Sequence, residues 1–505
     1  MRSVSSMDPL LRGLLGLVQS PNLWWVEYAL QPPFEAVVVF GGILLVTFAL
    51  IVTERIHQTV AALAGAVATI IAGKYFSLTY SWAPVLSFLA TGVPHELLFS
   101  DLEVFTEFVD WPTIFIIISV MIITAVTERS GLFEYIALKV IKSGGGNLKR
   151  MFLYLWIVSF LLASVLGITP AFIIIGALIL TITKVLELNP VPYILSCVFV
   201  ILAASTSTVL STLANILVAS HFNLNPFYYL SYDGFIMLGF PFALVSLAIA
   251  VAFTFWKFSD SFRIHEEEEY KEIRSKILAF DENMVIEDRR LFRIVSVLLI
   301  VTIIAFVVGG LMGIPFYMTA LLFAVIFFVV GGAEPKHVIA EVDWNLILFF
   351  IGIFIIVGGV DRAGILQSMG TQIGYMGIGN PATMTSLIYG FTCVFSGVVD
   401  EVSVVAVMVY AIPYISKTAF ISPGLIIWAV LYGANAGTSL TPVGGIPNMI
   451  AISELEKENV KVTWLGFMKI GIPITVLRVV TGILLLLFLA SLLGWGVDFL
   501  GTSLL

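Results

Sequence analysis

Two adjacent carboxylates in a long apolar region are the residues best suited to charge chemistry. Asp400 and Glu401 lie in the middle of residues 383–416, which are otherwise mostly apolar. A charge at the middle of a membrane is costly, so such a residue is a functional candidate by default. Because adjacent carboxylates repel each other, we expect one of the two to carry a proton. The pair therefore predicts a site for a coupling H⁺ or Na⁺.

Two polar segments, residues 205–215 and 435–448, interrupt other apolar runs. The Gly and Pro residues of 435–448 free backbone amides and carbonyls, while the hydroxyl and carboxamide groups of both segments add neutral ligands. A single hydroxyl more often serves close helix packing, but the clustering at both interruptions favours a binding site for a small ion. The expected substrate ligands are Ser205, Thr206, Ser207, Thr208, Ser211, Thr212, Asn215, Asn435, Thr438, Ser439, Thr441, Gly444, Gly445 and Asn448.

Three further hydroxyl groups lie near the carboxylate pair or near a similar break in residues 150–184. We expect Ser164, Thr169 and Ser396 to contribute to the coupling-ion site. If a metal ion binds, we expect it to be Na⁺, near Asp400, Thr441 and Asn448. The sequence indicates no other cofactor.

The composition restricts the class of protein. Hydrophobic residues make up 59% of the 505 residues, and charged residues make up 11%. Soluble domains are about 45–50% apolar and about 25% charged. The chain also lacks the spacings of a P-loop, a zinc protease or a nucleophile elbow. We therefore expect a multi-pass protein of the plasma or inner membrane that is not an enzyme and binds no nucleic acid.

The apolar runs predict the elements that must position these residues. Residues 150–184 and 383–416 are each broken near the middle, so we interpret them as hairpins that enter the membrane and return to the same side. One set of loops holds 18 of the 25 Lys and Arg residues, which indicates the inner side. Full spans are expected near residues 34–53, 57–73, 110–127, 192–220, 232–256, 291–309, 315–332, 343–360, 424–453 and 464–490.

An internal repeat organises the sequence. Val109–Asp110–Trp111 recurs as Val342–Asp343–Trp344, and nine of the 24 positions in 109–132 are identical to their equivalents in 342–365. The loop after the first copy is basic and its equivalent, residues 372–383, is uncharged, which predicts repeats of opposite orientation, a common build of secondary transporters. The predicted organisation is an all-α membrane protein with two inverted repeats of about five spans, each with a re-entrant hairpin and a broken helix. Its parts are an interfacial extension at 1–33, repeats at 34–256 and 291–505, and a charged cytoplasmic linker at 257–290.

These segments resemble the ion transporter superfamily, and within it the arsenite permease / P-protein group, the citrate-transporter-like ArsB/NhaD permeases. The resemblance covers about residues 34–490 and rests on VDWPTIFIIISVMIITAVTERSG, FSGVVDEVSVVAVM and GANAGTSLTPVGGIPNMIAIS together. It implies secondary active transport, re-entrant hairpins, inverted repeats and a homodimer that moves by an elevator-like shift. The family pattern has an Asp-Asn pair at each hairpin tip, whereas this chain has Ile168-Thr169 and Asp400-Glu401.

The sequence leaves several functions open. The first is H⁺- or Na⁺-coupled transport of a small ion, most readily an anion such as a carboxylate, by alternating access. Within transport, arsenite or antimonite efflux, with a separate ATPase subunit as a partner, and Na⁺/H⁺ antiport are the alternatives. The alternative of another class is a passive channel or a non-transporting membrane scaffold. The expected partners of the first reading are the ion substrate, the lipid bilayer and a second copy of the chain.

Overall fold

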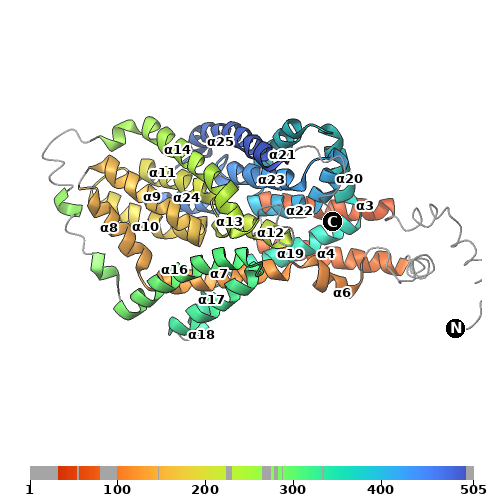
Figure 1. Ribbon diagram of the computed structural model, residues 1–505, viewed down its shortest axis with the longest axis horizontal. Coiled ribbons are helices and arrows are strands. Elements are labelled where there is room, and N and C mark those ends of the chain that lie inside the picture. Colours follow the sequence, from red (N-terminus) through yellow and green to blue (C-terminus); the bar gives the residue numbers. More distant parts are fainter. Residues whose placement is uncertain are drawn as a thin grey trace, which may run out of the picture. The chain divides into compact units, whose positions relative to one another are not determined.

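The computed structural model describes residues 32–53, 56–79, 99–145, 147–222, 230–263, 274–277, 282–286, 288–332 and 335–495. The described part is almost entirely helical and contains no strand (Figure 1), which confirms the all-α fold class. The predicted extension at 1–33 falls almost wholly outside the described residues, as does much of the linker at 257–290.

Many helices are long and apolar enough to cross a bilayer. Among the described residues there are ten with at least 18 residues and high mean hydropathy. Helix α17 (Phe316–Val330) falls outside this group because its 15 residues span only about 22 Å. The ten are α3 (Phe34–Thr53), α4 (Gln58–Thr79), α7 (Trp111–Arg129), α9 (Leu148–Leu166), α10 (Ile168–Val185), η6 (Phe235–Gly239) continued by α14 (Phe240–Lys257), α16 (Arg289–Leu311), α19 (Trp344–Arg362), α22 (Glu401–Ala419) and α25 (Trp464–Leu493).

Contacts divide the chain into two compact units. The first comprises residues 1–110 with 348–369, and the second comprises 111–347 with 370–505. This division follows packing and cuts across both repeats predicted from the sequence. All the predicted site residues lie in the second unit.

In the first unit, α3 and α4 pack against each other. Phe40 is at their centre, with its ring centroid 6.2 Å from Phe76 and 6.1 Å from Phe99. Arg362, at the end of α19, is 3.2 Å from a carboxylate oxygen of Glu103 and also pairs with Glu107. An ion pair therefore ties the end of α19 to the short segment α6–η2 (Asp101–Phe108).

The second unit contains both hairpins. In the first, α9 ends at Gly167, whose φ of +94° lets the chain reverse before α10. In the second, α21 (Pro381–Ser396) and α22 are separated by Gly397–Asp400. Asn147 and Asn380 cap the first helix of each hairpin, each accepting a hydrogen bond from a backbone amide three residues later. The hairpin arms and tips thus occur where the sequence predicts them.

Two further helices of the second unit are broken. Residues after α11 (Pro190–Ala203) pass through two short 3₁₀ turns, η3 (Ala204–Thr206) and η4 (Val209–Ser211), before α12 (Leu213–His221). Residues after α23 (Pro423–Gly437) pass through η9 (Pro442–Gly444) before α24 (Ile446–Lys457). The regions 192–220 and 424–453, expected as full spans, are each two half-helices joined by irregular backbone.

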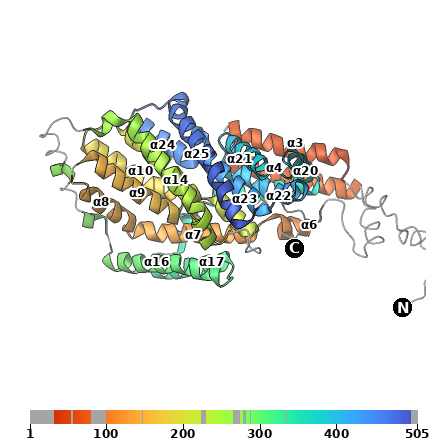
Figure 2. The ribbon, with the colours of Figure 1, turned by 45° about the horizontal axis from the view of Figure 1, so that its top comes forward.

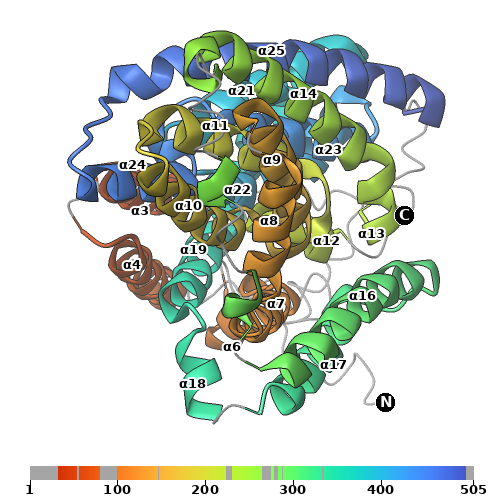
Figure 3. The same ribbon diagram turned by 90° about the vertical axis from the view of Figure 1, so that its left-hand side faces the viewer.

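Other helices surround these elements. Helix α25 packs against α14, α21 and α23 (Figures 2 and 3), and α16 and α17 pack against each other and against α7. The remaining described elements are α8 (Leu132–Ser143), α13 (Tyr232–Gly234), η7 (Ser259–Phe262), η8 (Glu282–Val285), α18 (Pro335–Ala340) and α20 (Ile365–Met376).

Helix boundaries recur at the repeat offset, the fixed interval in the sequence that separates Val109 from Val342. Helices α7 and α19 begin and end at equivalent positions, as do α8 and α20. The first residues of α9, α10, α11 and α12 likewise correspond to those of α21, α22, α23 and α24. The same order of elements therefore occurs twice, while the opposite orientation of the two copies remains a prediction.

Candidate functional site

Asp400 forms the tip of the second hairpin and caps α22. Its carboxylate accepts hydrogen bonds from the backbone N–H of Val402 at 2.8 Å, the N–H of Ser403 at 3.4 Å and the hydroxyl of Ser403 at 2.6 Å. Its φ of +149° is a strained backbone conformation that favours glycine, and the equivalent position in the first hairpin is Gly167. The three hydrogen bonds hold the half-buried Asp400 in place.

Glu401 is more deeply buried than its neighbour. Only 7% of its surface is exposed, and its Oε2 has no hydrogen-bond partner among the described residues. The Thr212 hydroxyl and the Arg478 guanidinium both act electrostatically on this carboxylate. A buried carboxylate oxygen without a partner is costly, so Glu401 is the member of the pair that has a free position for a proton or a cation.

The first hairpin tip lacks an acid, and the hydroxyl of Ser164 forms hydrogen bonds within the protein. Ser164 donates to Phe160 O at 2.8 Å and accepts from the Ser207 hydroxyl, also at 2.8 Å. Thr169 lies half-buried in the first turn of α10. On the second hairpin, Ser396 donates to Ala434 O at 2.7 Å. Ser164 and Ser396 therefore fasten the hairpins to the broken helices.

The first helix break, residues 204–212, is held by its own polar groups. The Asn215 carboxamide donates to Ser205 O at 2.7 Å and to Thr208 O at 2.9 Å, and Ser211 donates to the same two carbonyls. Thr212 caps α12 by accepting from Asn215 N at 3.3 Å. The buried hydroxyl of Thr206 has no partner among the described residues.

The second break repeats this arrangement. The Asn448 carboxamide donates to Thr438 O at 2.8 Å and to Thr441 O at 3.0 Å, and the repeat offset relates these two carbonyls to those of Ser205 and Thr208. Thr441 donates to Gly397 O at the hairpin tip, just as Thr208 donates to Ser164 O. Each break therefore uses an Asn to bridge two carbonyls and a Thr to bind its hairpin tip.

Close approach of the backbone at the second break explains two of its glycines, Gly437 and Gly444. A Cβ on Gly437 would lie 2.2 Å from Cys393 O, and a Cβ on Gly444 would lie 3.0 Å from Thr438 O. Gly445, which precedes α24, has its nearest such neighbour at 3.5 Å. Gly444 therefore allows the backbone to pack closely against Thr438. Neither Gly444 nor Gly445 is seen to contact the charged groups.

Arg478 is the functional candidate that reasoning from the sequence missed. It lies within α25 and is 1% exposed. It donates to Ser439 Oγ at 2.8 Å, Leu202 O at 3.2 Å, Ser246 Oγ at 3.3 Å and Ser205 Oγ at 3.4 Å. One cation therefore contacts both helix breaks, through Ser205 in the first and Ser439 in the second. The available signal was a lone Arg inside a long apolar helix, a type of residue that is a functional candidate by default.

The two breaks also contact each other directly. The Asn435 carboxamide donates to Asn215 Oδ1 at 3.2 Å and to Leu431 O at 2.8 Å. The Oδ1 atoms of Asn435 and Asn448 are buried and lack a partner among the described residues. Thr438 donates to Asn435 O at 2.8 Å. The structure thus gathers the second hairpin tip, both breaks and Arg478 into one buried polar centre, in which unpaired oxygens could accept a hydrogen bond or ligate a cation.

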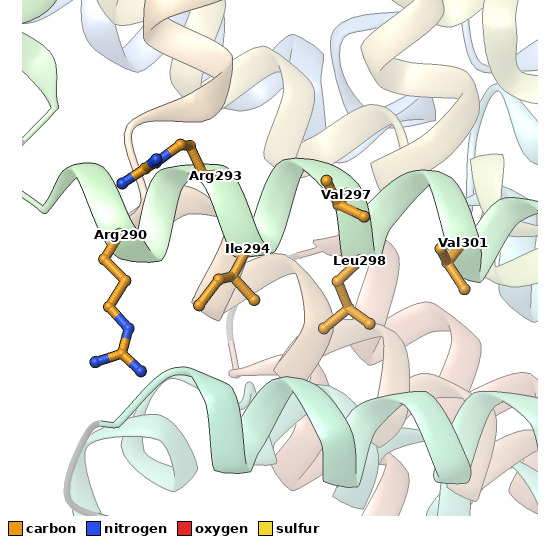
Figure 4. A pocket seen from close by; sticks show the side chains of 6 residues that line it. All are labelled: Arg290, Arg293, Ile294, Val297, Leu298 and Val301. Atoms are coloured by element: carbon orange, nitrogen blue, oxygen red, sulfur yellow. The ribbon is translucent and has the colours of Figure 1, made fainter.

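A separate groove of about 470 Å³ lies on one face of α16 (Figure 4). Arg290 and Arg293 lie at one end, and aliphatic side chains follow along the helix. None of its lining residues belongs to the buried polar centre. The groove is lined by Arg290, Arg293, Ile294, Val297, Leu298 and Val301.

Comparisons with known proteins identify the family of the chain and proteins of similar fold. Residues 48–433 match the family model described as "Citrate transporter". An uncharacterized transporter of Mycobacterium tuberculosis is 25% identical over 447 residues, which cover 88% of this chain and 96% of that protein. The arsenical pump membrane protein of Escherichia coli is 24% identical over 397 residues, which cover 77% and 87%. The solved structure of the Alcanivorax borkumensis YdaH transporter has a similar fold, with a TM-score of 0.57 at 11% identity, covering 87% of this chain and 99% of that one.

Proposed function

The chain belongs to the citrate transporter family, and from this premise we propose that it is a secondary-active transporter that couples H⁺ or Na⁺ movement to a small anion such as a carboxylate. That it is a multi-pass integral membrane transporter follows from the family and from the ten apolar helices. The substrate, the coupling ion and the mechanism are the proposed part.

The observation that carries the proposal is the environment of Glu401. Its carboxylate is buried beside a helix break, its Oε2 lacks a partner among the described residues, and Arg478 acts on it electrostatically. A structural carboxylate in such a place would have its hydrogen bonds satisfied. A carboxylate that must gain and lose a proton or Na⁺ needs a free oxygen. We therefore assign the coupling role to Glu401, with Asp400 holding the tip that carries it.

The repeated elements support the proposed transport cycle. Two hairpins and two broken helices that meet at one centre are the parts from which inverted-repeat transporters build a midplane site. In this proposal the second unit carries the substrate by an elevator-like shift, and the protein works as a homodimer. If Na⁺ is the coupling ion, the oxygens near Asp400, Thr441 and Asn448 hold it.

Arsenite or antimonite efflux is the second candidate, because a relative at 24% identity is an arsenical pump membrane protein. The cysteines give it little support: Cys197 donates a weak hydrogen bond to Ser159, and Cys393 on α21 is the one described thiol near Arg478. Na⁺/H⁺ antiport, and a channel or scaffold without coupling, are the remaining outcomes of the test.

The test is uptake into proteoliposomes under an imposed H⁺ or Na⁺ gradient, with citrate, succinate, sulfate, arsenite and radioactive Na⁺ as the probes. The proposal expects gradient-driven accumulation of an anion, lost in Glu401→Gln and retained in Glu456→Gln, which changes an exposed Glu of α24. Accumulation of arsenite alone, exchange of Na⁺ for H⁺, or anion flux that ignores both gradients would each replace the proposal with the corresponding alternative.

A further inference from the structure

Arg478 is a buried positive charge that forms no direct ion pair with a described residue. No carboxylate of the described residues lies within salt-bridge distance of it, and the groups that accept its hydrogen bonds are three hydroxyls and one carbonyl, all neutral. Burying an ion costs several kcal/mol even after the surroundings adjust, and a counter-charge that is not in direct contact offsets only part of this cost. Neutral hydrogen bonds to Ser246 and Leu202 would anchor α25 equally well from an uncharged donor, so the retained charge indicates a further role.

The position of Arg478 suggests what that role is. Its guanidinium contacts Ser205 in the first break and Ser439 in the second. Three of its four hydrogen bonds are 3.2 Å or longer, beyond the usual range for a charged donor. A hydroxyl that accepts a hydrogen bond from an arginine can rotate. It can then donate a hydrogen bond to an anion that takes its place as the acceptor beside the guanidinium. The face of Phe242 lies 5.8 Å from the guanidinium carbon and supports the planar group.

We propose that Arg478 is the anion-binding residue of the transport site, and that the substrate presents a carboxylate or another oxyanion to it, with Ser205 and Ser439 as auxiliary donors. A guanidinium binds two oxygens of one oxyanion at once, which is the geometry that an arginine provides and a lysine does not. This inference rests on the proposed function and deepens it by assigning the residue that binds the anion.

The charges around Arg478 also determine the sign of the coupling. Glu401 acts on Arg478 electrostatically, and the other titratable groups near the pair are Asp400 at the hairpin tip and Tyr389 and Cys393 on α21. The ring of His221 of α12 contacts the ring of Tyr410, with the ring centroids 5.1 Å apart, and Tyr410 lies about 13 Å along α22 from Glu401. With Glu401 ionised, the charges of Glu401 and Arg478 cancel. Binding an anion then leaves an excess negative charge, which a proton on Glu401 lowers by one unit, so we expect anion and proton to be bound together.

Anion binding to purified protein tests this inference without requiring transport. The probes are sulfate, whose charge does not change between about pH 5.5 and about pH 8, and acetate, succinate and citrate. A ligand of the native state raises its thermal stability by mass action. We expect at least one of these anions to stabilise the wild type, more strongly at the lower pH when compared at equal concentrations of its fully ionised form. In Glu401→Gln the same anion should stabilise equally at both pH values.

Variants separate anion binding from a structural role. Arg478→Gln should weaken anion binding by more than about thirtyfold. Arg478→Lys keeps the charge, so it should weaken anion binding by about tenfold and leave the dependence of that binding on pH in place. Lys469→Gln, which removes an exposed cation from the same helix, should bind as the wild type does. If Arg478→Gln does not fold, the single variants Ser439→Ala and Arg478→Lys are compared with the wild type instead. Both retain the positive charge, and each should weaken anion binding.

The outcomes distinguish this inference from the proposed function. No stabilisation of the wild type by any of the four anions, or equal anion affinity in the wild type and the Arg478 variants, would overturn the inference. Gradient-driven flux of Na⁺ or arsenite that depends on Glu401 but not on Arg478 would support coupled transport and overturn the anion site. Arg478-dependent anion binding in a protein whose flux ignores every gradient would leave the anion site standing without coupling.

Discussion

The Asn435 carboxamide donates a hydrogen bond to Asn215 Oδ1 at 3.2 Å and so joins two helix breaks that are 220 residues apart in the chain. Around this contact, Asn215 and Asn448 each bridge two backbone carbonyls, at positions related by the repeat offset. Irregular backbone at membrane depth is tolerated only where its polar groups are satisfied or face water. These carboxamides therefore allow the breaks to exist.

Replacement of either bridging Asn should destabilise the protein. Asn215→Ala and Asn448→Ala each leave buried carbonyls with fewer partners, which costs about 1–3 kcal/mol. Thermal unfolding in detergent should show a drop of similar size for the two variants. Asn380→Ala, which removes an exposed helix cap, should cost about 1 kcal/mol. An Asn448 variant as stable as the wild type would mean that the second break does not depend on this bridge.

The hairpin tip should tolerate glycine better than alanine at position 400. Both Asp400→Gly and Asp400→Ala lose the three hydrogen bonds that cap α22, but alanine also keeps the strained φ of +149°. Such strain costs about 1–3 kcal/mol, so Asp400→Ala should unfold at the lower temperature. Ser403→Ala, which removes one of the three bonds, should have the smallest effect. Equal stability of the Gly and Ala variants would show that the backbone relaxes at this position.

Close packing of α23 on the second hairpin should make Gly437 intolerant of a side chain. A Cβ there would lie 2.2 Å from Cys393 O, so Gly437→Ala must displace backbone and should cost about 1–3 kcal/mol. Gly390→Ala, on α21, meets nothing within 4 Å and should be neutral or stabilising by up to about 1 kcal/mol. Thermal midpoints of the two variants give the comparison. Equal thermal midpoints of the Gly437 and Gly390 variants would contradict the close packing of α23 on α21.

The sequence predicted the elements well where local signals are strong. Gly167 and Asp400 mark the hairpin tips because a break in a long apolar run has few explanations in a membrane. The break at 205–215 was predicted from its cluster of Ser and Thr, and the break at 435–448 from Gly and Pro as well, which free backbone groups that other parts of the chain must satisfy. The repeat offset found in the sequence recurs in the helix boundaries.

The sequence could not predict the partners of these residues. Arg478 contacts Leu202, Ser205 and Ser246, which are far away in the chain, and no spacing in an apolar helix tells which side the arginine faces. The two acids also looked alike in sequence. The structure separates them, because the Asp400 carboxylate is used by its own helix whereas Glu401 keeps a free oxygen.

The most direct measurement of the central claim is proton movement in proteoliposomes that contain a pH-sensitive dye, recorded when citrate or succinate is added outside. The account predicts that the wild type carries protons inward with the anion. Glu401→Gln should still exchange labelled anion across the membrane but move no protons with it, because the residue that takes up the proton is gone. Anion-dependent proton movement of wild-type size in Glu401→Gln would contradict the account.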